Sequence, residues 1–576
     1  MRHRARGQRE DDDDDATFPH GENVAPLRCP GDAEAVLQLC YPRPPGGWMA
    51  VWKNYLRRRR TRARRHRPWA PWELLQIVRE RAAAGERIRA VGSGHSASAA
   101  PQPSQGGHFV ELDHIAGEMP WPWYADGGQY VRVGAGTTIA ALNAMLDARG
   151  LALHNMGSWD GQTVAGATAT GTHGSGLRHP PMCDRVVAIE LVTDEKDPDS
   201  GARVQRFLRI EREGLTDVGA FEAARARFGD EDDPVRTLKL EPDDDLLNAA
   251  RIHLGCFGVV YALTLEVRPR FWLKERPQVM TWDRVKEVPL EERARAHPEF
   301  FWMLCVPHRY AEGSPYAGQP LCVLIEREEL RPRDGEAPRR DGVLDRLLRF
   351  GVQIVSTGLL ENVGLFFPRL GQWVFRRDFE GRSVFSSASA EVMKTSLGPE
   401  VHAISIEAFV PLDRAQEAVE RIIALAEELE TPNGRLDEGE HWHTSPIGVR
   451  FVAASEAWLA PSFDGPACAI EIPLLYDETE LPWVRARHDR YRFSMLRRLE
   501  LALRPLGARL HWGQHHTIDG AEAAARYGAR WTRWKQVYAR FNAYGTFSNP
   551  LTAQLGLDPV RALWAVDAPA PEWAPE

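Results

Sequence analysis

Two glycine-rich segments hold the residues of this chain that are best suited to bind a phosphate-bearing ligand. The first is Gly92-Ser93-Gly94-His95-Ser96, and in the second, 157–176, glycine alternates with threonine and serine. Glycine lets the backbone turn sharply and approach a ligand closely, while free N–H groups and hydroxyls suit a diphosphate. Neither segment has the lysine pattern of a P-loop or the spacing of a dinucleotide fingerprint. The occurrence of both clusters in this order is therefore stronger evidence for a phosphate-binding site than either cluster alone.

Secondary-structure elements on both sides position these segments. The apolar run Ile88–Val91 predicts a strand that leads into the histidine turn. Further strands are expected at 109–112, 130–133, 185–193, 300–304, 322–325 and 405–411, and helices at 72–84, 139–149 and 415–429. Segment 195–245 is acidic and irregular, which predicts an insertion, and the pattern resumes at 252–260.

Taken together, the motifs resemble the covalent-flavin branch of the vanillyl-alcohol oxidase superfamily, and within it the sugar-lactone and alditol oxidases (D-arabinono-1,4-lactone oxidase and L-gulonolactone oxidase types). That family carries a vGsGHSf segment, whose histidine binds FAD covalently, and a GSisdQTvaGaistGTHGtG segment that wraps the pyrophosphate. The resemblance implies an α+β fold, with a PCMH-type FAD-binding domain of two subdomains and an α+β cap (substrate) domain with a large antiparallel sheet. The implied parts are a mobile extension (1–45), the FAD-binding domain (46–270), the cap domain (271–510) and a C-terminal segment that returns to the flavin (511–576).

The resemblance also implies the cofactor, FAD, and its attachment through His95. One bond is expected, because no cysteine lies where a doubly linked flavin would need its second attachment. The segment 252–260 resembles the family's LGalGvit element, whose backbone lines the flavin. The implied cofactor-binding residues are Gly92, Ser93, Gly94, His95, Ser96, Gly157, Ser158, Gln162, Thr163, Gly166, Thr170, Gly171, Thr172, His173, Gly174, Ser175, Gly255, Gly258, Val259, Val260 and His511.

The catalytic signature departs from the family pattern. Relatives carry Glu-x-Arg on a strand and then His-Trp-Gly-Lys, whereas this chain has Gly448-Val449-Arg450 and His511-Trp512-Gly513-Gln514. The absent carboxylate and lysine predict an unpaired Arg450 as electrostatic anchor, Gln514 as a neutral donor, and a substrate that is less polar or bulkier than an aldonolactone. His443 or His515 is the expected replacement base, and the histidines do not have the spacing of a metal site.

The leading functional hypothesis is an FAD-dependent oxidoreductase that oxidises a CH–OH group. Gly157 stands where the related plant galactonolactone dehydrogenase carries an oxygen-hindering alanine, which favours oxygen as the acceptor. The alternatives are a flavin-binding protein with weak or lost catalysis, and a dehydrogenase of a bulkier, less polar alcohol such as a sterol. Anaerobic bleaching of the flavin by candidate substrates distinguishes them.

Bulk properties indicate a cytoplasmic protein. The seven scattered cysteines fit thiols in a reducing compartment, and no apolar run is long enough for a bilayer span. The net charge of −8 argues against nucleic acid as a general partner. The arginine-rich run 57–67 is expected to be a solvated entry segment, with nucleic-acid binding as its alternative, and the apolar segment 344–374 a helix over the substrate cavity or an interface, with peripheral membrane contact as the alternative.

Overall fold

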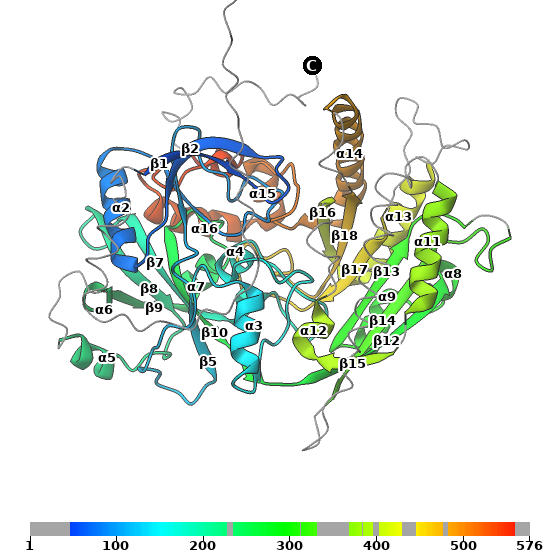
Figure 1. The fold of residues 1–576 in the computed structure, drawn as a ribbon, viewed down its shortest axis with the longest axis horizontal. Helices are drawn as coiled ribbons and strands as arrows, with labels where there is room; N and C mark the ends of the chain where they lie inside the picture. The colour runs from blue at the N-terminus through cyan, green and yellow to red at the C-terminus, as the bar shows by residue number, and fades with distance from the viewer. Residues whose placement is uncertain are drawn as a thin grey trace, which may run out of the picture. The chain divides into compact units, whose positions relative to one another are not determined.

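The fold is seen in a computed structural model that describes residues 47–226, 234–310, 313–330, 368–382, 384–394, 403–428, 445–475 and 482–558. Residues 48–558 of this description belong to one compact unit (Figure 1). Three main sheets organise it. Predictions on the acidic run 11–15, on most of 344–374, and on His441 and His443 lie outside the described residues.

The first sheet carries the histidine turn at the end of one strand. Its strands, in spatial order, are β1 (Trp48–Lys53), β2 (Arg60–His66), β4 (His108–Glu111) and β3 (Ile88–Val91). β3 and β4 are parallel neighbours, and β1 and β2 form an antiparallel ribbon. The arginine-rich run is therefore part of a sheet rather than only an entry segment, because Thr61 and Ala63 alternate with arginines and fill its buried face.

The second sheet has the order β5 (Tyr130–Gly134), β10 (Val259–Glu266), β7 (Val186–Lys196), β8 (Arg203–Glu211), β9 (Lys239–Pro242). Helices α2 (Pro71–Ala83) and α16 (Ala529–Phe541) pack against β7, and α2 also contacts β8. The two sheets match the two subdomains predicted for the FAD-binding domain. α3 (Ile139–Asp147) and α4 (Val164–Ala169) begin at threonine caps, Thr138 and Thr163, whose hydroxyls accept backbone N–H groups of the first turn.

The prediction that 195–245 is an irregular insertion is wrong. β8 pairs with β7 along its whole length, and β9 extends the sheet. Charged composition was misleading because some charges are buried in pairs: Nη1 of Arg209 lies 2.6 Å from Glu190 Oε1, and its Nε lies 2.6 Å from Glu211 Oε2. Fully buried charges persist only when they are paired in this way.

The third sheet is antiparallel throughout, as predicted for the cap. Its order is β15 (Phe385–Ala388), β12 (Trp272–Thr281), β14 (Leu321–Leu330), β13 (Phe300–Val306), β17 (Ile447–Val452), β18 (Ala467–Leu475), β16 (Ala403–Pro411), β19 (Arg509–Leu510). α13 (Ala415–Glu428) and α14 (Pro482–Leu503) pack on its β16 and β18 side and against each other (Figure 1). β17, β18 and β16 carry the polar residues described below.

The remaining elements connect these sheets. A two-stranded sheet pairs β6 (Leu151–Ala152) with β11 (Arg268–Pro269). The other helices are α5 (Val218–Arg225), α6 (Pro234–Thr237), α7 (Asp244–Ala250), α8 (Trp282–Val285), α9 (Leu290–Ala296), α11 (Pro368–Gly381), α12 (Ser389–Met393), α15 (Gly520–Tyr527) and α17 (Pro550–Gln554).

Candidate active site

The two glycine-rich segments are in direct contact. A Cβ placed on Gly92 would lie 2.2 Å from the Thr163 hydroxyl oxygen, so only glycine fits at this position without displacing Thr163. The first segment also meets the C-terminal part of the chain, because the N–H of Ala97 donates to the carbonyl of Gly513 at 2.9 Å. The predicted association of these segments is therefore present in the fold.

The 252–260 segment joins the same region through a strained turn. Leu254 has a φ of 51° and Gly255 a φ of 70°, and a left-handed conformation at a leucine is sparsely populated and typical of functional sites. The N–H of Leu254 donates to Ala169 at 3.3 Å. The buried guanidinium of Arg89, on β3, donates to the carbonyls of Leu254 and Gly255, the latter at 2.8 Å.

His95 lies at the turn that the sequence predicted. Gly94 has a φ of 66°, which glycine adopts without strain, and its carbonyl accepts the N–H of Tyr55 at 2.7 Å. The His95 ring is half-buried, with the Tyr55 ring centroid 4.9 Å away and the Trp159 ring stacked at 5.8 Å. The turn and the two aromatic rings thus hold the imidazole in position.

The region fits FAD by the chemistry of its donors. Gly92, Ser93 and Gly166 are exposed at the junction of the two segments, so backbone can be approached there. A Cβ on Gly174 would lie 2.1 Å from the Asn155 side-chain oxygen, which shows how tightly the loop is folded. Backbone N–H groups of such a loop suit a pyrophosphate, whereas the hydroxyls of Thr168, Thr170 and Ser175 already donate to carbonyl groups within the protein.

Arg450, on β17, is the centre of a polar cluster. Its guanidinium donates to the Ser158 hydroxyl at 2.7 Å, to Glu471 Oε2 at 3.0 Å and to Glu407 Oε1 at 3.3 Å. The prediction of an unpaired arginine is therefore wrong. The family carboxylate is absent from position 448, but two neighbouring strands, β18 and β16, each supply one.

Glu407 is the buried, charged member of the cluster. His173 Nε2 lies 3.1 Å from its Oε1, while His173 Nδ1 lies 2.8 Å from the carbonyl of Gly174. Burial acts to raise the pKa of Glu407, but His173 and Arg450 outweigh it and hold that pKa well below its usual range.

Glu471 behaves differently from Glu407. Burial raises the pKa of Glu471; Arg450 opposes this effect, and the Glu407 carboxylate adds to it. Gln514 connects β16 and β18. Its amide carbonyl accepts the hydroxyl of Ser405, on β16, at 2.8 Å, and its amide nitrogen donates to Glu471, on β18, at 3.4 Å. Gln514 thus lies in the cluster as a neutral donor, as the sequence suggested.

Sequence reasoning missed Glu407 and Glu471, although a signal was available. Each stands alone in an apolar strand, between Ile406 and Ala408 and between Ile470 and Ile472. A lone carboxylate in a buried strand needs a partner. The antiparallel pairing places Glu407 directly opposite Glu471, so both reach the same arginine.

The histidines of the predicted site have different surroundings. His511 is buried beside the cluster: its N–H donates to the carbonyl of Glu407 at 2.9 Å, and burial lowers its pKa to about 4. His515 packs its ring against Phe493 at 5.0 Å, and burial lowers its pKa to about 4, with the nearby Arg59 and Arg58 adding to this. Its assignment as the replacement base stays a prediction.

Ser175 fastens the second loop to the cap sheet. Its hydroxyl accepts the N–H of Phe451, on β17, at 3.0 Å and donates to the carbonyl of Phe301, on β13. Gly258 begins the turn into β10 with a φ of 149°, and a Cβ there would lie 2.6 Å from the carbonyl of Val192. The remaining predicted cofactor residues lie in these loops or strands: Gly157, Gln162, Thr170, Gly171, Thr172, Val259 and Val260.

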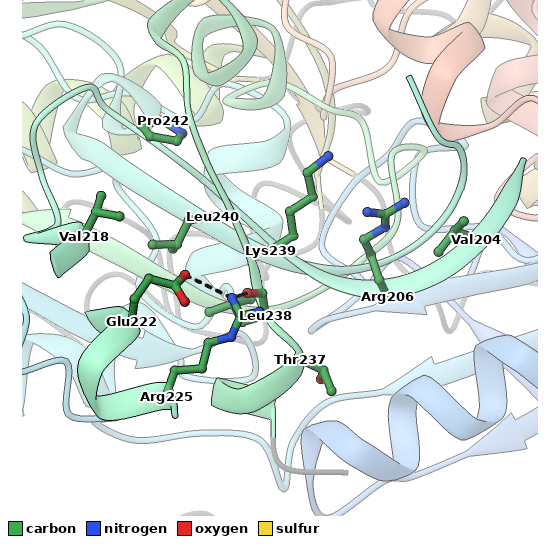
Figure 2. A pocket seen from close by; sticks show the side chains of 10 residues that line it. All are labelled: Val204, Arg206, Val218, Glu222, Arg225, Thr237, Leu238, Lys239, Leu240 and Pro242. Carbon is green, nitrogen blue, oxygen red and sulfur yellow. Dashed lines mark hydrogen bonds and ion pairs between the residues drawn. The ribbon is translucent and has the colours of Figure 1, made fainter. Parts of the chain in front are cut away.

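A cavity of about 590 Å³ lies elsewhere, between β8, β9 and α5. Figure 2 shows its lining, in which Glu222 points toward Arg225. Arg206 is likewise paired, with Nε 3.0 Å from Glu195. Its lining includes none of the predicted site residues, so the cluster around Arg450 is the better candidate for chemistry.

Two findings concern only the described ranges. No group of three histidine, cysteine or acidic side chains there is arranged to hold a metal ion. No helix there has the length and apolarity needed to cross a bilayer.

Comparisons with known proteins agree with this geometry. The FAD binding domain model matches residues 67–196. Two relatives are an L-gulono-1,4-lactone dehydrogenase from Mycobacterium tuberculosis (26% identical, covering 85% of this chain and 95% of the relative) and an alditol oxidase from Streptomyces sp. (27%, with the same coverage).

Among solved structures, a solvent-stable cholesterol oxidase (14% identical, TM-score 0.61, covering 88% of this chain and 98% of the other) and a cholesterol oxidase from B. sterolicum (12%, TM-score 0.62, covering 92% and 100%) share the fold. At such identity the likeness concerns the fold alone. The D-arabinono-1,4-lactone oxidase model matches residues 263–555, just over half of the 576 residues. The chain therefore belongs to the D-arabinono-1,4-lactone oxidase family and is an FAD-dependent oxidoreductase that acts on CH–OH donors.

Proposed function

We propose that the substrate is polyhydroxylated, a sugar lactone or an alditol, and that its reacting hydroxyl binds at Arg450. The observation that carries this proposal is the Arg450 cluster beside Ser158, a residue of the glycine-rich loop. Arg450, Glu471, Gln514 and Ser158 combine a cation, a carboxylate, an amide and a hydroxyl. Such a set is matched to several hydroxyl groups and poorly matched to an apolar ring system.

The hypothesis of a less polar substrate depended on the absence of a carboxylate. Because Glu407 and Glu471 both contact Arg450, that reason no longer applies. The L-gulono-1,4-lactone dehydrogenase and the alditol oxidase to which the chain is similar are named for polar substrates. The likeness to cholesterol oxidases concerns the fold and does not extend to the substrate.

When bound, FAD would supply the acceptor for the hydride of the substrate carbon. The chain's own residues bind and orient the alcohol. Arg450 would stabilise negative charge that develops on the substrate oxygen, and burial strengthens this effect. Behind Arg450, the Glu407 carboxylate lies 3.3 Å from the guanidinium and 3.1 Å from His173 Nε2, so that Glu407 helps to fix the orientation of the guanidinium.

FAD attachment is the second part of the proposal: one covalent bond to His95. Its support is the vGsGHSf motif together with the half-buried turn position of the imidazole between Tyr55 and Trp159. The cofactor would contact residues 46–270 and the returning segment after 510, with the substrate on the side of residues 271–510. We also propose oxygen as the acceptor, on the basis of Gly157, and a cytoplasmic location, on the basis of buried thiols such as Cys183 and Cys468.

Two experiments test this function. Protein from flavin-replete cells is precipitated with acid, and yellow colour in the pellet with a flavin-bearing peptide containing His95 is expected; a colourless pellet overturns the covalent bond. L-Gulono-1,4-lactone, a series of alditols and apolar alcohols are then added anaerobically. Fastest bleaching by a lactone or alditol is expected, whereas bleaching by apolar alcohols alone overturns the substrate class, and no bleaching at all favours a flavoprotein without catalysis.

A further inference from the structure

Gly448, the position on β17 that lacks a side chain, lies beside a carboxylate of the neighbouring strand, β18. Gly448 and Glu471 are direct partners in the antiparallel pairing of β17 and β18. A Cβ built on Gly448 would lie 3.8 Å from Glu471 Cβ and 4.0 Å from Glu471 Oε2. A side chain at 448 and the carboxyl group of Glu471 would therefore share one region above the sheet, beside Arg450.

The two carboxylates of the cluster differ in accessibility. The side chain of Glu407 is 4% exposed and is shared between His173 and Arg450, whereas that of Glu471 is 25% exposed. Arg450, at 14%, lies between them. A molecule that enters from outside can reach Glu471 without breaking the inner ion pair.

Two hydrogen-bond donors, from Gln514 and Arg450, lie next to the Glu471 carboxylate. The amide nitrogen of Gln514 lies 3.4 Å from its Oε1, and the guanidinium of Arg450 lies 3.0 Å from its Oε2. Ser158, the other group on Arg450, is half-buried. A substrate hydroxyl donates as well as accepts, and a carboxylate is the strongest acceptor for it.

We propose that Glu471 is the substrate-contacting carboxylate of this enzyme and accepts a hydrogen bond from a substrate hydroxyl in the space left by Gly448. The inference deepens the proposed function and rests on it. In this arrangement the carboxylate comes from β18 instead of β17, one strand away from its place in the Glu-x-Arg pattern. Specificity for a hydroxylated substrate is retained although the local motif is lost.

A purely structural role for Glu471 would make it redundant with Glu407. If it served only to neutralise and orient Arg450, Glu407 would duplicate it, because Glu407 already pairs with the same guanidinium. The raised pKa of Glu471, caused first by burial and then by the nearby Glu407, reflects the electrostatic cost of placing a second carboxylate beside Glu407. A group retained at that electrostatic cost fits a role in binding.

The experiment relocates the carboxylate. Glu471→Ala and Glu471→Gln are compared with the double variant Gly448→Glu/Glu471→Ala, each checked for parental flavin content. We expect both single variants to raise KM for L-gulono-1,4-lactone, or for the alditol that bleaches the flavin fastest, by about tenfold or more, as for loss of a charged hydrogen bond. The double variant is expected to recover at least part of that loss, since its glutamate enters the vacated space.

The control is Glu275→Gln, on β12. Glu275 is also a buried carboxylate paired with an arginine, Arg327, in the same sheet at 2.8 Å, and its KM should match the parent. A KM within threefold of the parent in Glu471→Ala and Glu471→Gln overturns the proposal. A fall in kcat at unchanged KM also overturns it, because that is the signature of a positioning role.

The double variant provides a second test of the proposal. If Gly448→Glu/Glu471→Ala is no better than Glu471→Ala, the two side chains do not share one function, and the proposal fails. Failure of the proposed function looks different: the parent itself would not be bleached by any lactone or alditol. The same four variants are then measured with the alcohol that does bleach the parent, and the threefold criterion applies unchanged.

Discussion

Arg450 donates a 2.7 Å hydrogen bond to the hydroxyl of Ser158, 292 residues earlier in the chain. This bond joins the cap sheet to the glycine-rich loop at the point where substrate and cofactor are expected to meet. Through the same Nη2, Arg450 also donates to Glu471, and through Nη1 it donates to Glu407. Its position is therefore determined by three strands and one loop, and it cannot be altered without effect on the site.

Replacing Arg450 by Met should slow flavin reduction by about a hundredfold or more, because two charged hydrogen bonds and the cation beside the reacting oxygen are lost. The rate is measured anaerobically by stopped-flow at saturating substrate. Arg327→Met, which removes a paired arginine of the same sheet, is the matched control and should keep the parental rate. Equal rates in the parent and Arg450→Met would contradict the role of Arg450.

Replacing His173 by Gln should shift the pH dependence of flavin reduction. His173 is the leading cause that lowers the Glu407 pKa against the effect of burial. Without it that pKa rises, so the acidic limb of the profile should move to higher pH. The rate of flavin reduction is followed between pH 4.5 and 8; a profile that moves to lower pH, or does not move, would show that Glu407 is not coupled to the site through His173.

Much of the FAD-binding half could be predicted from local sequence. The strand Ile88–Val91 occurs with the predicted bounds, and a glycine-rich loop follows from residues adjacent in sequence. Local patterns determine such segments because turn geometry and hydrogen-bond donors come from the same few residues.

The polar cluster around Arg450 could not be predicted in this way. Glu407, Arg450 and Glu471 meet only through strand register, which depends on long-range pairing. Gly448 stands two residues before Arg450, where the Glu-x-Arg pattern has its carboxylate, so local sequence alone predicts that the negative charge is missing. The prediction that 195–245 is irregular failed for the same reason. Composition does not reveal which charges are paired, and Arg209 is buried in ion pairs with Glu190 and Glu211.

Gly92→Ala should reduce FAD content. The new Cβ would lie 2.2 Å from the Thr163 hydroxyl oxygen, and rotating Thr163 away removes its cap on Gly166 N–H at the start of α4. Flavin content is measured from the ratio of absorbance at about 450 nm to that at 280 nm. Gly127→Ala, an exposed glycine with open space at its Cβ position, serves as the control and should remain fully loaded. Full loading of both variants would contradict close packing of the two segments in solution.

Arg89→Met should lower both stability and flavin content. The buried guanidinium holds the carbonyls of Leu254 and Gly255 and so maintains the left-handed turn. Its loss leaves buried carbonyls without their donor, at a cost of about 3 kcal/mol. Denaturant unfolding of the flavin-free and flavin-loaded protein measures the change. A variant as stable as the parent would contradict the structural role of Arg89.

Acidification from pH 6.5 toward 4 should destabilise the protein. Burial, first among the causes, lowers the pKa of His253 to about 3, of His511 to about 4 and of His516 to about 3. Below pH 6.5 the unfolded chain binds protons at these histidines while the folded chain does not, so stability is present above the unfolded pKa and is lost as pH falls. The loss is on the order of 1.4 kcal/mol per pH unit for each such histidine. Burial also raises the pKa values of Asp184, Glu195, Glu471 and Glu500, which acts in the opposite direction. Four further histidines whose pKa burial lowers to about 4 add to the acid loss: His66, His154, His179 and His515.

The midpoint of thermal unfolding, measured from pH 7.5 to 4.5, should fall by about 3 °C or more. The variant His516→Gln tests this explanation more directly, because it removes one of the histidines that bind a proton only in the unfolded chain. The variant should be less stable than the parent at pH 7.5, yet its stability should decline less steeply on acidification. A midpoint that rises as pH falls, or a slope that His516→Gln leaves unchanged, would show that these histidines are not held neutral by the folded structure.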